Sequence, residues 1–272
     1  MVYSHADAAG WTLYWITYGI MAVTALIFFA MSLRRPIQQR SHHYTSFLIV
    51  AIASLAYYAM ASQGGNTRIR VYQGPADSYR QIFWARYVDW FFTTPLLLLD
   101  LVLLSNLSKL RIAAIMVADI FMILTGLFGA VEARSNKWGW FVFGCIFMLY
   151  IFYELLVNVR KGAYARGGQH GMLYSVLLVW LLILWVQYPV VWGLAEGSST
   201  VSSDTEIAWY AALDICAKCV FGFILLLGIE SIDRKRAATG SSNKPPMPAG
   251  TTRTGASAAP AAAAPEVVRD VV

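Results

Sequence analysis

Long apolar stretches, separated by short polar segments, run along most of the chain. Residues 8–33, 41–67 and 167–195 contain no lysine, arginine, aspartate or glutamate, and residues 112–131 contain only Asp119. Because about 20 apolar residues suffice to cross the hydrocarbon core of a bilayer, each stretch is long enough for one transmembrane helix. The pattern predicts seven such helices, at about 10–33, 42–63, 80–104, 109–130, 137–160, 170–195 and 205–232.

The segments between and after these helices differ in character. Residues 64–78 are polar and glycine-rich, which is typical of a loop and leaves room for a small hairpin. From residue 237 the composition shifts abruptly to alanine, proline, serine, threonine and glycine. We expect one domain over residues 1–236 and a disordered cytoplasmic tail over residues 237–272.

Composition supports the membrane interpretation. Hydrophobic residues make up 58% of the chain and charged residues 13%, whereas soluble domains have about 25% charged residues. These values exclude a disordered protein, a disulfide scaffold and an ordinary soluble enzyme. We therefore expect an all-α integral membrane protein, a seven-helix bundle in the plasma membrane with the lipid bilayer as its immediate partner.

The basic residues predict the orientation of this bundle. With the N-terminus outside, the inner segments would hold Arg34, Arg35, Arg40, Lys109, Arg111, Arg160, Lys161, Arg166, Arg234, Lys235 and Arg236. The outer loops would hold Arg68, Arg70, Arg80, Arg134 and Lys137. This orientation places eleven basic residues inside and five outside, so the positive-inside rule favours an outer N-terminus and a cytoplasmic C-terminus. The net charge of +6 is thus a topology signal, and we expect no nucleic-acid partner.

Ionisable residues inside the predicted spans are the candidates for function. Each costs a few kcal/mol or more at the bilayer centre, so such residues usually face the bundle interior and mark a pathway or a cofactor. The alternative is a satisfied polar contact between helices, which is less plausible for several residues than for one. The seven are Arg86, Asp89, Asp100, Asp119, Glu154, Asp214 and Lys218.

Helical spacing places most of these charges on two faces. Arg86 and Asp89 are three residues apart, and Asp100 returns to nearly the same azimuth about 16 Å further along the axis. Asp214 and Lys218 share a face at i and i+4. If the two helices face each other, Arg86, Lys218, Asp89 and Asp214 would form a neutral cluster, the form in which buried charges survive.

The surroundings of the carboxyls separate their roles. Asp100 lies within a run of leucines, which favours its neutral, protonated form and makes it a proton source. An ionised carboxylate such as Asp89 is a proton acceptor. Lys218 between them would serve as a relay or as a covalent anchor, because a buried amine suits both tasks.

Three segments resemble a known family. Residues 85–100, ARYVDWFFTTPLLLLD, closely resemble helix C of the microbial (type 1) rhodopsins, and most of all the bacteriorhodopsin-like proton pumps. Residues 213–218, LDICAK, resemble the retinal-binding helix G of that family, and residues 185–192, WVQYPVVW, resemble its helix F. The resemblance covers about residues 10–232, and the tail gives it a eukaryotic, fungal or algal, character.

The resemblance implies a role for each central charge. Lys218 would carry all-trans retinal as a protonated Schiff base. Asp89 would be the primary counterion and first proton acceptor, and Asp214 the second counterion. Arg86 would lie between them and the outside, and Asp100 would return a proton from the cytoplasmic side.

The resemblance also implies the flanking groups. Glu196 and Glu206 match two glutamates that release the proton, although solvated surface is an equal alternative for both and for Asp204. The retinal pocket would comprise Trp90, Thr94, Leu97, Met122, Gly126, Met148, Trp185, Tyr188 and Trp192. Asp119 would lie near the ionone ring, and Tyr57 would bond to Asp214. Without Lys218, the aromatic stripe of Trp185, Tyr188 and Trp192 would be attributed to packing.

Some residues depart from the family pattern. Phe141 and Gly144 replace a tryptophan and a serine that are common in the pocket. Ser46 replaces a threonine that usually accompanies the proton donor.

Three further side chains carry purely structural expectations. We expect Glu154 to reach toward Arg160. We expect His42 and His43 to be solvated, and no metal site.

The sequence thus predicts a light-driven outward proton pump, a photoactive ion transporter rather than an enzyme. The alternatives are a sensory photoreceptor or a light-gated channel of the same fold, and a receptor without retinal. Asp100 disfavours a sensor, and the line of Arg86, Asp89 and Asp100 disfavours a channel. Protons are the expected substrate, and a trimer or dimer is expected by analogy with the family.

Overall fold

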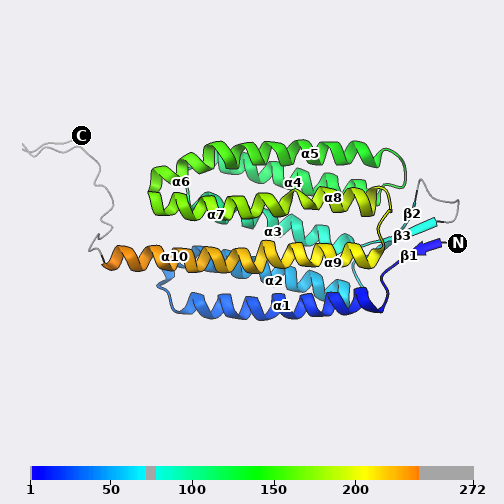
Figure 1. Cartoon of the computed structure of the whole chain (residues 1–272), viewed down its shortest axis with the longest axis horizontal. Helices are drawn as coiled ribbons and strands as arrows, with labels where there is room; N and C mark the ends of the chain where they lie inside the picture. Colours follow the sequence, from blue (N-terminus) through cyan, green and yellow to red (C-terminus); the bar gives the residue numbers. More distant parts are fainter. Residues whose placement is uncertain (1, 72–77, 239–272) are drawn as a thin grey trace, which may run out of the picture.

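A computed structural model describes residues 2–71 and 78–238. The described part of the chain forms seven helical segments that run back and forth along one axis, so that its two ends lie at opposite ends of the bundle (Figure 1). The predicted seven-helix fold is confirmed. The last helix continues to Ala238, so residues 237 and 238, which were expected to begin the tail, are helical. The rest of the predicted tail, residues 239–272, lies outside the described residues.

Four of the segments are single helices: α1 (Ala8–Leu33), α2 (Ser41–Ala61), α3 (Trp84–Leu103) and α4 (Lys109–Val131). A short 3-10 turn, η1 (Ile37–Gln39), lies between α1 and α2. The fifth segment joins α5 (Lys137–Tyr153), the π-helical turn η2 (Glu154–Val159) and α6 (Arg160–Arg166). The sixth joins α7 (Gly168–Trp185), α8 (Gln187–Trp192) and the π-helical turn η3 (Gly193–Gly197). The seventh joins α9 (Ser203–Asp214), the π-helical turn η4 (Ile215–Val220) and α10 (Phe221–Ala238).

The helices have the length and composition of membrane spans. Within the described residues, six segments are long and apolar enough to cross a bilayer. The remaining one, α3, is less apolar because it carries Arg86, Asp89 and Asp100. Large apolar side chains such as Leu26 and Leu55 are exposed on the outer surface of the bundle, whereas these charged side chains are buried inside it. The protein is therefore an integral membrane protein.

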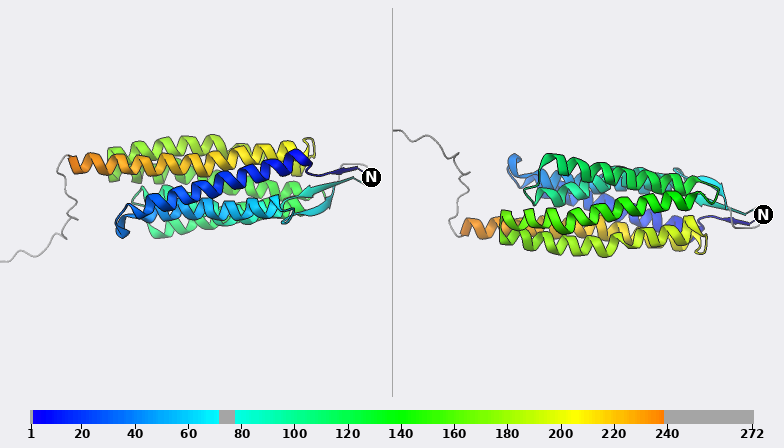
Figure 2. Two further views of the ribbon diagram at one scale, coloured as in Figure 1. Left: turned by 90° about the horizontal axis from the view of Figure 1, so that it is seen from below. Right: turned by 90° about the horizontal axis from the view of Figure 1, so that it is seen from above.

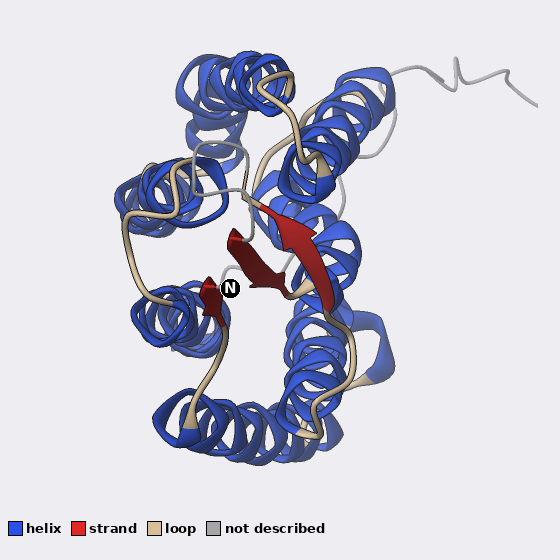
Figure 3. Cartoon of the chain, turned by 90° about the vertical axis from the view of Figure 1, so that its right-hand side faces the viewer, coloured by secondary structure: helices blue, strands red, loops and turns tan. Residues whose placement is uncertain are grey.

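A small sheet covers one end of the bundle. Strand β1 (Val2–Ser4) pairs in parallel with β3 (Ser78–Ile82), and β3 pairs antiparallel with β2 (Thr67–Arg70). Figure 3 shows these strands lying across the helix ends. The polar loop, which left room for a small hairpin, does contribute an antiparallel strand pair, although β3 extends into the segment expected to be helical. The helix expected from residue 80 instead begins at Trp84, because residues 78–82 are drawn into the sheet.

We call this end the sheet end and the other the tail end. Figure 2 shows from two further sides that the strands project beyond the helices at the sheet end and that α10 projects at the tail end. Asp7 caps α1 at the sheet end by accepting a hydrogen bond from the Ala9 amide, 2.9 Å away. Because β3 comes directly before α3, the sheet ties the start of α3 to the N-terminal segment.

Candidate functional site

The central group is a buried lysine held between two aspartates. The Nζ atom of Lys218, on η4, lies 2.8 Å from Asp214 Oδ1 and 3.2 Å from Asp89 Oδ2. All three side chains are at most 2% exposed. As predicted, α3 and the seventh segment face each other, since Asp89 lies on α3 and Lys218 on the seventh segment. Lys218 lies on a π-helical turn, a feature that is frequent at functional sites.

The two aspartates are held very differently. Asp214 accepts hydrogen bonds from the Tyr188 hydroxyl at 2.7 Å, the Tyr57 hydroxyl at 2.9 Å and the Trp90 indole at 3.3 Å. Neither carboxyl oxygen of Asp89 accepts a hydrogen bond from the described residues, and its contact with Lys218 is an ion pair. Three donors stabilise Asp214 as a carboxylate. Protonation would therefore weaken fewer hydrogen bonds at Asp89 than at Asp214.

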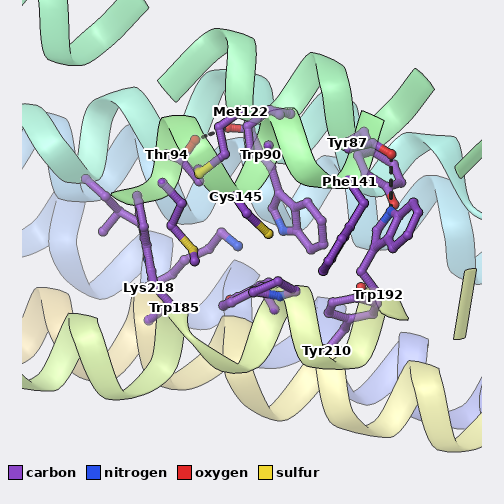
Figure 4. Close-up of a pocket in the computed structure, with 18 residues that line it drawn as sticks. Tyr87, Trp90, Thr94, Met122, Phe141, Cys145, Trp185, Trp192, Tyr210 and Lys218 are labelled. Carbon is purple, nitrogen blue, oxygen red and sulfur yellow. Dashed lines mark hydrogen bonds between the residues drawn. The ribbon is translucent and has the colours of Figure 1, made fainter. Parts of the chain in front are cut away.

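An apolar pocket opens in front of Lys218 (Figure 4). It holds about 790 Å³ of atom-free space, part of it open to the surroundings, and its wall is almost entirely apolar. Lys218 and Trp185 lie toward one side of it, Phe141 and Trp192 toward the other. The nine pocket residues predicted from the sequence all line it: Trp90, Thr94, Leu97, Met122, Gly126, Met148, Trp185, Tyr188 and Trp192.

The pocket also has a lining that the sequence did not indicate. This additional lining comprises Tyr87, Ile123, Cys145, Pro189, Tyr210 and Ala217, and the two replaced positions Phe141 and Gly144 are part of the wall. Tyr57 and Asp119 are not part of the lining. Tyr57 bonds to Asp214 as expected, and Asp119 contacts the pocket residue Thr94.

Asp119 contacts the pocket through Thr94. The Thr94 hydroxyl lies 2.7 Å from Asp119 Oδ2 and 2.7 Å from the Trp90 carbonyl oxygen. A hydroxyl has one proton to donate, and both of these oxygens can accept it. Thr94 thus links the buried Asp119 carboxyl to the wall of the pocket.

A second buried cluster lies toward the sheet end. Arg86 Nη1 donates to Glu206 Oε1 at 2.6 Å and lies 3.5 Å from Glu196 Oε1. Arg80 Nη2 donates to the other oxygen of Glu206 at 2.7 Å. The prediction that Arg86 joins Lys218 and the two aspartates in one neutral cluster is wrong. Lys218 does pair with both aspartates, but Arg86 pairs with the two glutamates instead. We call Arg80, Arg86, Glu196 and Glu206 the release cluster, after the proton release that the family resemblance implies for the two glutamates.

The release cluster is enclosed by further donors. The Tyr87 hydroxyl donates to Glu196 at 3.1 Å, and Lys137 Nζ donates to the backbone oxygen of Glu196 at 2.7 Å. The alternative of a solvated surface is wrong for both glutamates, since each is at most 2% exposed. Asp204 is partly exposed and accepts a hydrogen bond from the Asp7 amide.

Arg80 is a site residue that sequence reasoning missed. The sequence places it in a solvated outer loop, but the structure buries it in β3 and directs it at Glu206. The alternating pattern of a strand offers a signal for such burial, but the segment is only five residues long. Pairing with Glu206 could not be read from spacing, since the two are far apart in sequence.

A third polar group lies near the tail end, around Asp100. Its carboxyl is fully buried and accepts a hydrogen bond from the Ser46 hydroxyl at 3.3 Å. His42 Nδ1 lies 3.0 Å from the other carboxyl oxygen. The expectation that His42 and His43 are solvated is wrong, because His42 contacts Asp100 and His43 is buried.

The prediction that Glu154 reaches toward Arg160 is also wrong. Its carboxylate accepts a hydrogen bond from Asn158 at 2.9 Å and lies 3.8 Å from Arg111 on α4. The π-helical turn that contains Glu154 and Asn158 places both on one side, so the carboxylate is satisfied within its own segment and pairs with Arg111 rather than Arg160.

Comparison with known proteins gives consistent matches over the whole bundle. Residues 8–232 match the family described as bacteriorhodopsin-like protein. The opsin-like protein carO of Fusarium fujikuroi is 40% identical over 228 residues, which is 82% of this chain and 74% of that protein.

Solved structures extend the match to three dimensions. The light-driven proton pump rhodopsin of Coccomyxa subellipsoidea is 46% identical, with a TM-score of 0.81 over 83% of this chain and 99% of that one. A light-driven proton pump from Leptosphaeria maculans is 36% identical, with a TM-score of 0.80 over 85% and 100% of the two chains.

Proposed function

The chain belongs to the bacteriorhodopsin-like family of microbial rhodopsins, and from this premise we propose that it is a light-driven outward proton pump with retinal bound to Lys218. Membership of the family implies a retinal chromophore and an ion-transporting photoprotein rather than a classical enzyme. The observation that carries the proposal is the order of three buried polar groups along one bundle: Asp100, the Lys218 group and the release cluster.

The residues present fit retinal. An apolar, aromatic-lined pocket begins at a buried amine, and the buried carboxylate of Asp89 forms an ion pair with that amine. Lys218 would hold the chromophore through Nζ, with Trp90, Trp185 and Trp192 among the side chains that enclose it. When bound, retinal supplies the light-driven isomerisation from all-trans to 13-cis that changes the position and basicity of the Lys218 nitrogen.

The chain's own groups then determine where the proton goes. Asp89 accepts the proton from the Lys218 nitrogen, because Asp214 is already held as a carboxylate by three donors. Protonation of Asp89 removes a negative charge from the neighbourhood of Arg86, three residues away on α3. Arg86 is then drawn more strongly to Glu196 and Glu206, which favours loss of a proton from that pair.

Asp100 completes the path on the other side. Its fully buried carboxyl holds a proton that it can return to the Lys218 nitrogen from the tail end. With the N-terminus outside, as the distribution of basic residues favours, the sheet end faces out and the tail end faces the cytoplasm. Net transfer from Asp100 to the release cluster is then outward.

Light-driven acidification tests the proposal. Cells that express the full chain should acidify the medium under illumination when all-trans retinal is supplied, and a protonophore should abolish the change. Cells without retinal are the control. A retinal absorption band without any pH change would contradict the pump and favour the sensory photoreceptor. A pH change that reverses with the imposed proton gradient would favour the light-gated channel.

Arg80→Gln is expected to delay proton release several-fold while colour and net pumping persist. Arg80 is one of two guanidinium groups on Glu206, and its removal takes away one of the two charge-assisted hydrogen bonds that stabilise the carboxylate left after release. A water-soluble pH dye reports release after a laser flash. Arg134→Gln, an exposed arginine at the sheet end, should release the proton at the wild-type time. An unchanged release time in Arg80→Gln would contradict this role.

A further inference from the structure

His42 and Asp100 form a partly buried pair that the family assignment does not explain. His42 is the second residue of α2, and its Nδ1 atom lies 3.0 Å from Asp100 Oδ1. Ser46, one turn further along α2, contacts the other carboxyl oxygen. Two side chains from the tail-end half of α2 therefore hold the Asp100 carboxyl from α3.

The two ends of this pair differ in their access to solvent. The Asp100 side chain is 0% exposed, whereas the His42 side chain is 13% exposed. Protons that enter from the tail end can reach the imidazole directly, but they cannot reach Asp100 without crossing another group. Ser46 is 2% exposed and offers a single hydroxyl, whereas an imidazole has two ring nitrogens, each of which can carry a proton.

We propose that His42 takes up protons from the cytoplasm and passes them to Asp100 after Asp100 has delivered its own proton. This inference rests on the proposed function, because it assigns the uptake step of the same pump. The partner chemistry is a proton carried by water or buffer at the tail end. His42 would be a catalytic residue in this step, since it contacts the carboxyl that receives the proton.

The proton balance of this step closes. Neutral His42 begins with a proton on Nδ1 and faces the Asp100 carboxylate. The Nδ1 proton moves to Asp100 Oδ1 while a proton from the cytoplasm binds Nε2, so that the ring is neutral before and after and one proton has crossed it. Exchange of the ring proton between the two nitrogens through water, or rotation of the ring, restores the starting state.

Other titratable groups near His42 are His43 on the same helix, His170 on α7 and the Asp100 carboxyl itself. His43 is buried, with both ring nitrogens unpartnered among the described residues. His170 is buried against Arg236, with its Nδ1 atom 3.4 Å from the guanidinium. Of the three histidines, His42 is the one placed in hydrogen-bond contact with Asp100.

The test is flash spectroscopy of the retinal-loaded full chain in lipid vesicles, with His42→Gln as the main variant. Glutamine can keep a hydrogen bond to Asp100 but cannot carry a proton. Recovery of the visible band follows reprotonation of the Lys218 nitrogen, and the infrared carbonyl band follows reprotonation of Asp100. In His42→Gln we expect Asp100 to regain its proton about tenfold more slowly, with the preceding transfer to Lys218 nearly unchanged.

Two comparison variants separate this role from a structural one. Asp100→Asn should slow the reprotonation of Lys218 itself, which is the earlier step. His170→Gln, at a buried histidine of the same end, should leave both steps unchanged. If His42→Gln yields no coloured protein, the same measurements on His42→Asn decide the question.

Rescue gives an independent measurement. In His42→Ala, millimolar imidazole in the medium should restore the rate of Asp100 reprotonation, because a free imidazole can occupy the space and carry the proton. A wild-type rate in His42→Gln, or no effect of imidazole on a slowed His42→Ala, would overturn the inference. Acidification by wild-type cells tests the pump separately from the role of His42. If wild-type cells acidify the medium, failure of the His42 inference leaves the proposed pump intact. If they do not, the pump itself is refuted.

Discussion

Replacement of Lys218 by alanine is expected to abolish the visible absorption band and all light-driven acidification. The alanine side chain has no amine, and no other lysine lines the pocket in the part of the chain that the structure describes. The loss should be complete rather than partial, because covalent attachment is a precondition for every later step. The measurement is the absorption spectrum of purified protein after addition of all-trans retinal, followed by the pH response of illuminated cells.

The alanine variant also removes the partner of two buried carboxylates. Breaking a buried ion pair costs about 3–5 kcal/mol, so Lys218→Ala can lose stability as well as colour. Lys218→Arg keeps the positive charge beside Asp89 and Asp214 but cannot form the link to retinal, and it should be folded and colourless. Cys216→Ala, on the same π-helical turn, should keep its colour. A visible band in Lys218→Arg would show that the anchor is a different residue.

Replacement of Asp89 by asparagine is expected to leave a coloured protein that does not pump. The substitution removes the negative charge 3.2 Å from the Lys218 nitrogen, so the visible band should move to longer wavelength. The amide cannot accept the proton, and Asp214 cannot replace it without weakening the three hydrogen bonds that hold it as a carboxylate. The absorption maximum and the external pH under illumination check both parts.

Asp119→Asn is the matched control for this result. Asp119 is also a fully buried aspartate, but it contacts Thr94 rather than Lys218. Its asparagine variant should continue to acidify the medium. If Asp89→Asn pumped at the wild-type rate, the assignment of Asp89 as acceptor would be wrong.

The seven helices and the central charges could be predicted because both depend on local patterns. An apolar run of sufficient length predicts a span without any knowledge of its neighbours. The spacing of Asp214 and Lys218 fixes them on one helical face, and the spacing of Arg86, Asp89 and Asp100 does the same for α3. The nine predicted pocket residues came with the family resemblance, which carries tertiary information that spacing lacks.

The partners of these groups could not be predicted, because they come from segments far apart in sequence. Spacing favours Arg86 beside Asp89 and Asp214, but a long, flexible side chain has several possible directions from one helical position, and this one points to Glu206. The sequence favours a solvated His42 because it follows the start of a helix, where exposure is usual. Only the packing of α2 against α3 shows that its ring meets Asp100.

The small sheet has a practical consequence for the design of expression tags. β1 is paired with the strand that carries Arg80, the Ser4 hydroxyl lies 2.9 Å from that of Ser203, and the Ala6 amide bonds to the Gln81 side chain. A fluorescent protein or purification handle fused ahead of Val2 would pull on this strand and, through it, on the release cluster. The last described helix, α10, ends at Ala238 at the other end of the bundle from this sheet, so C-terminal fusions are the appropriate choice for kinetic work on this protein.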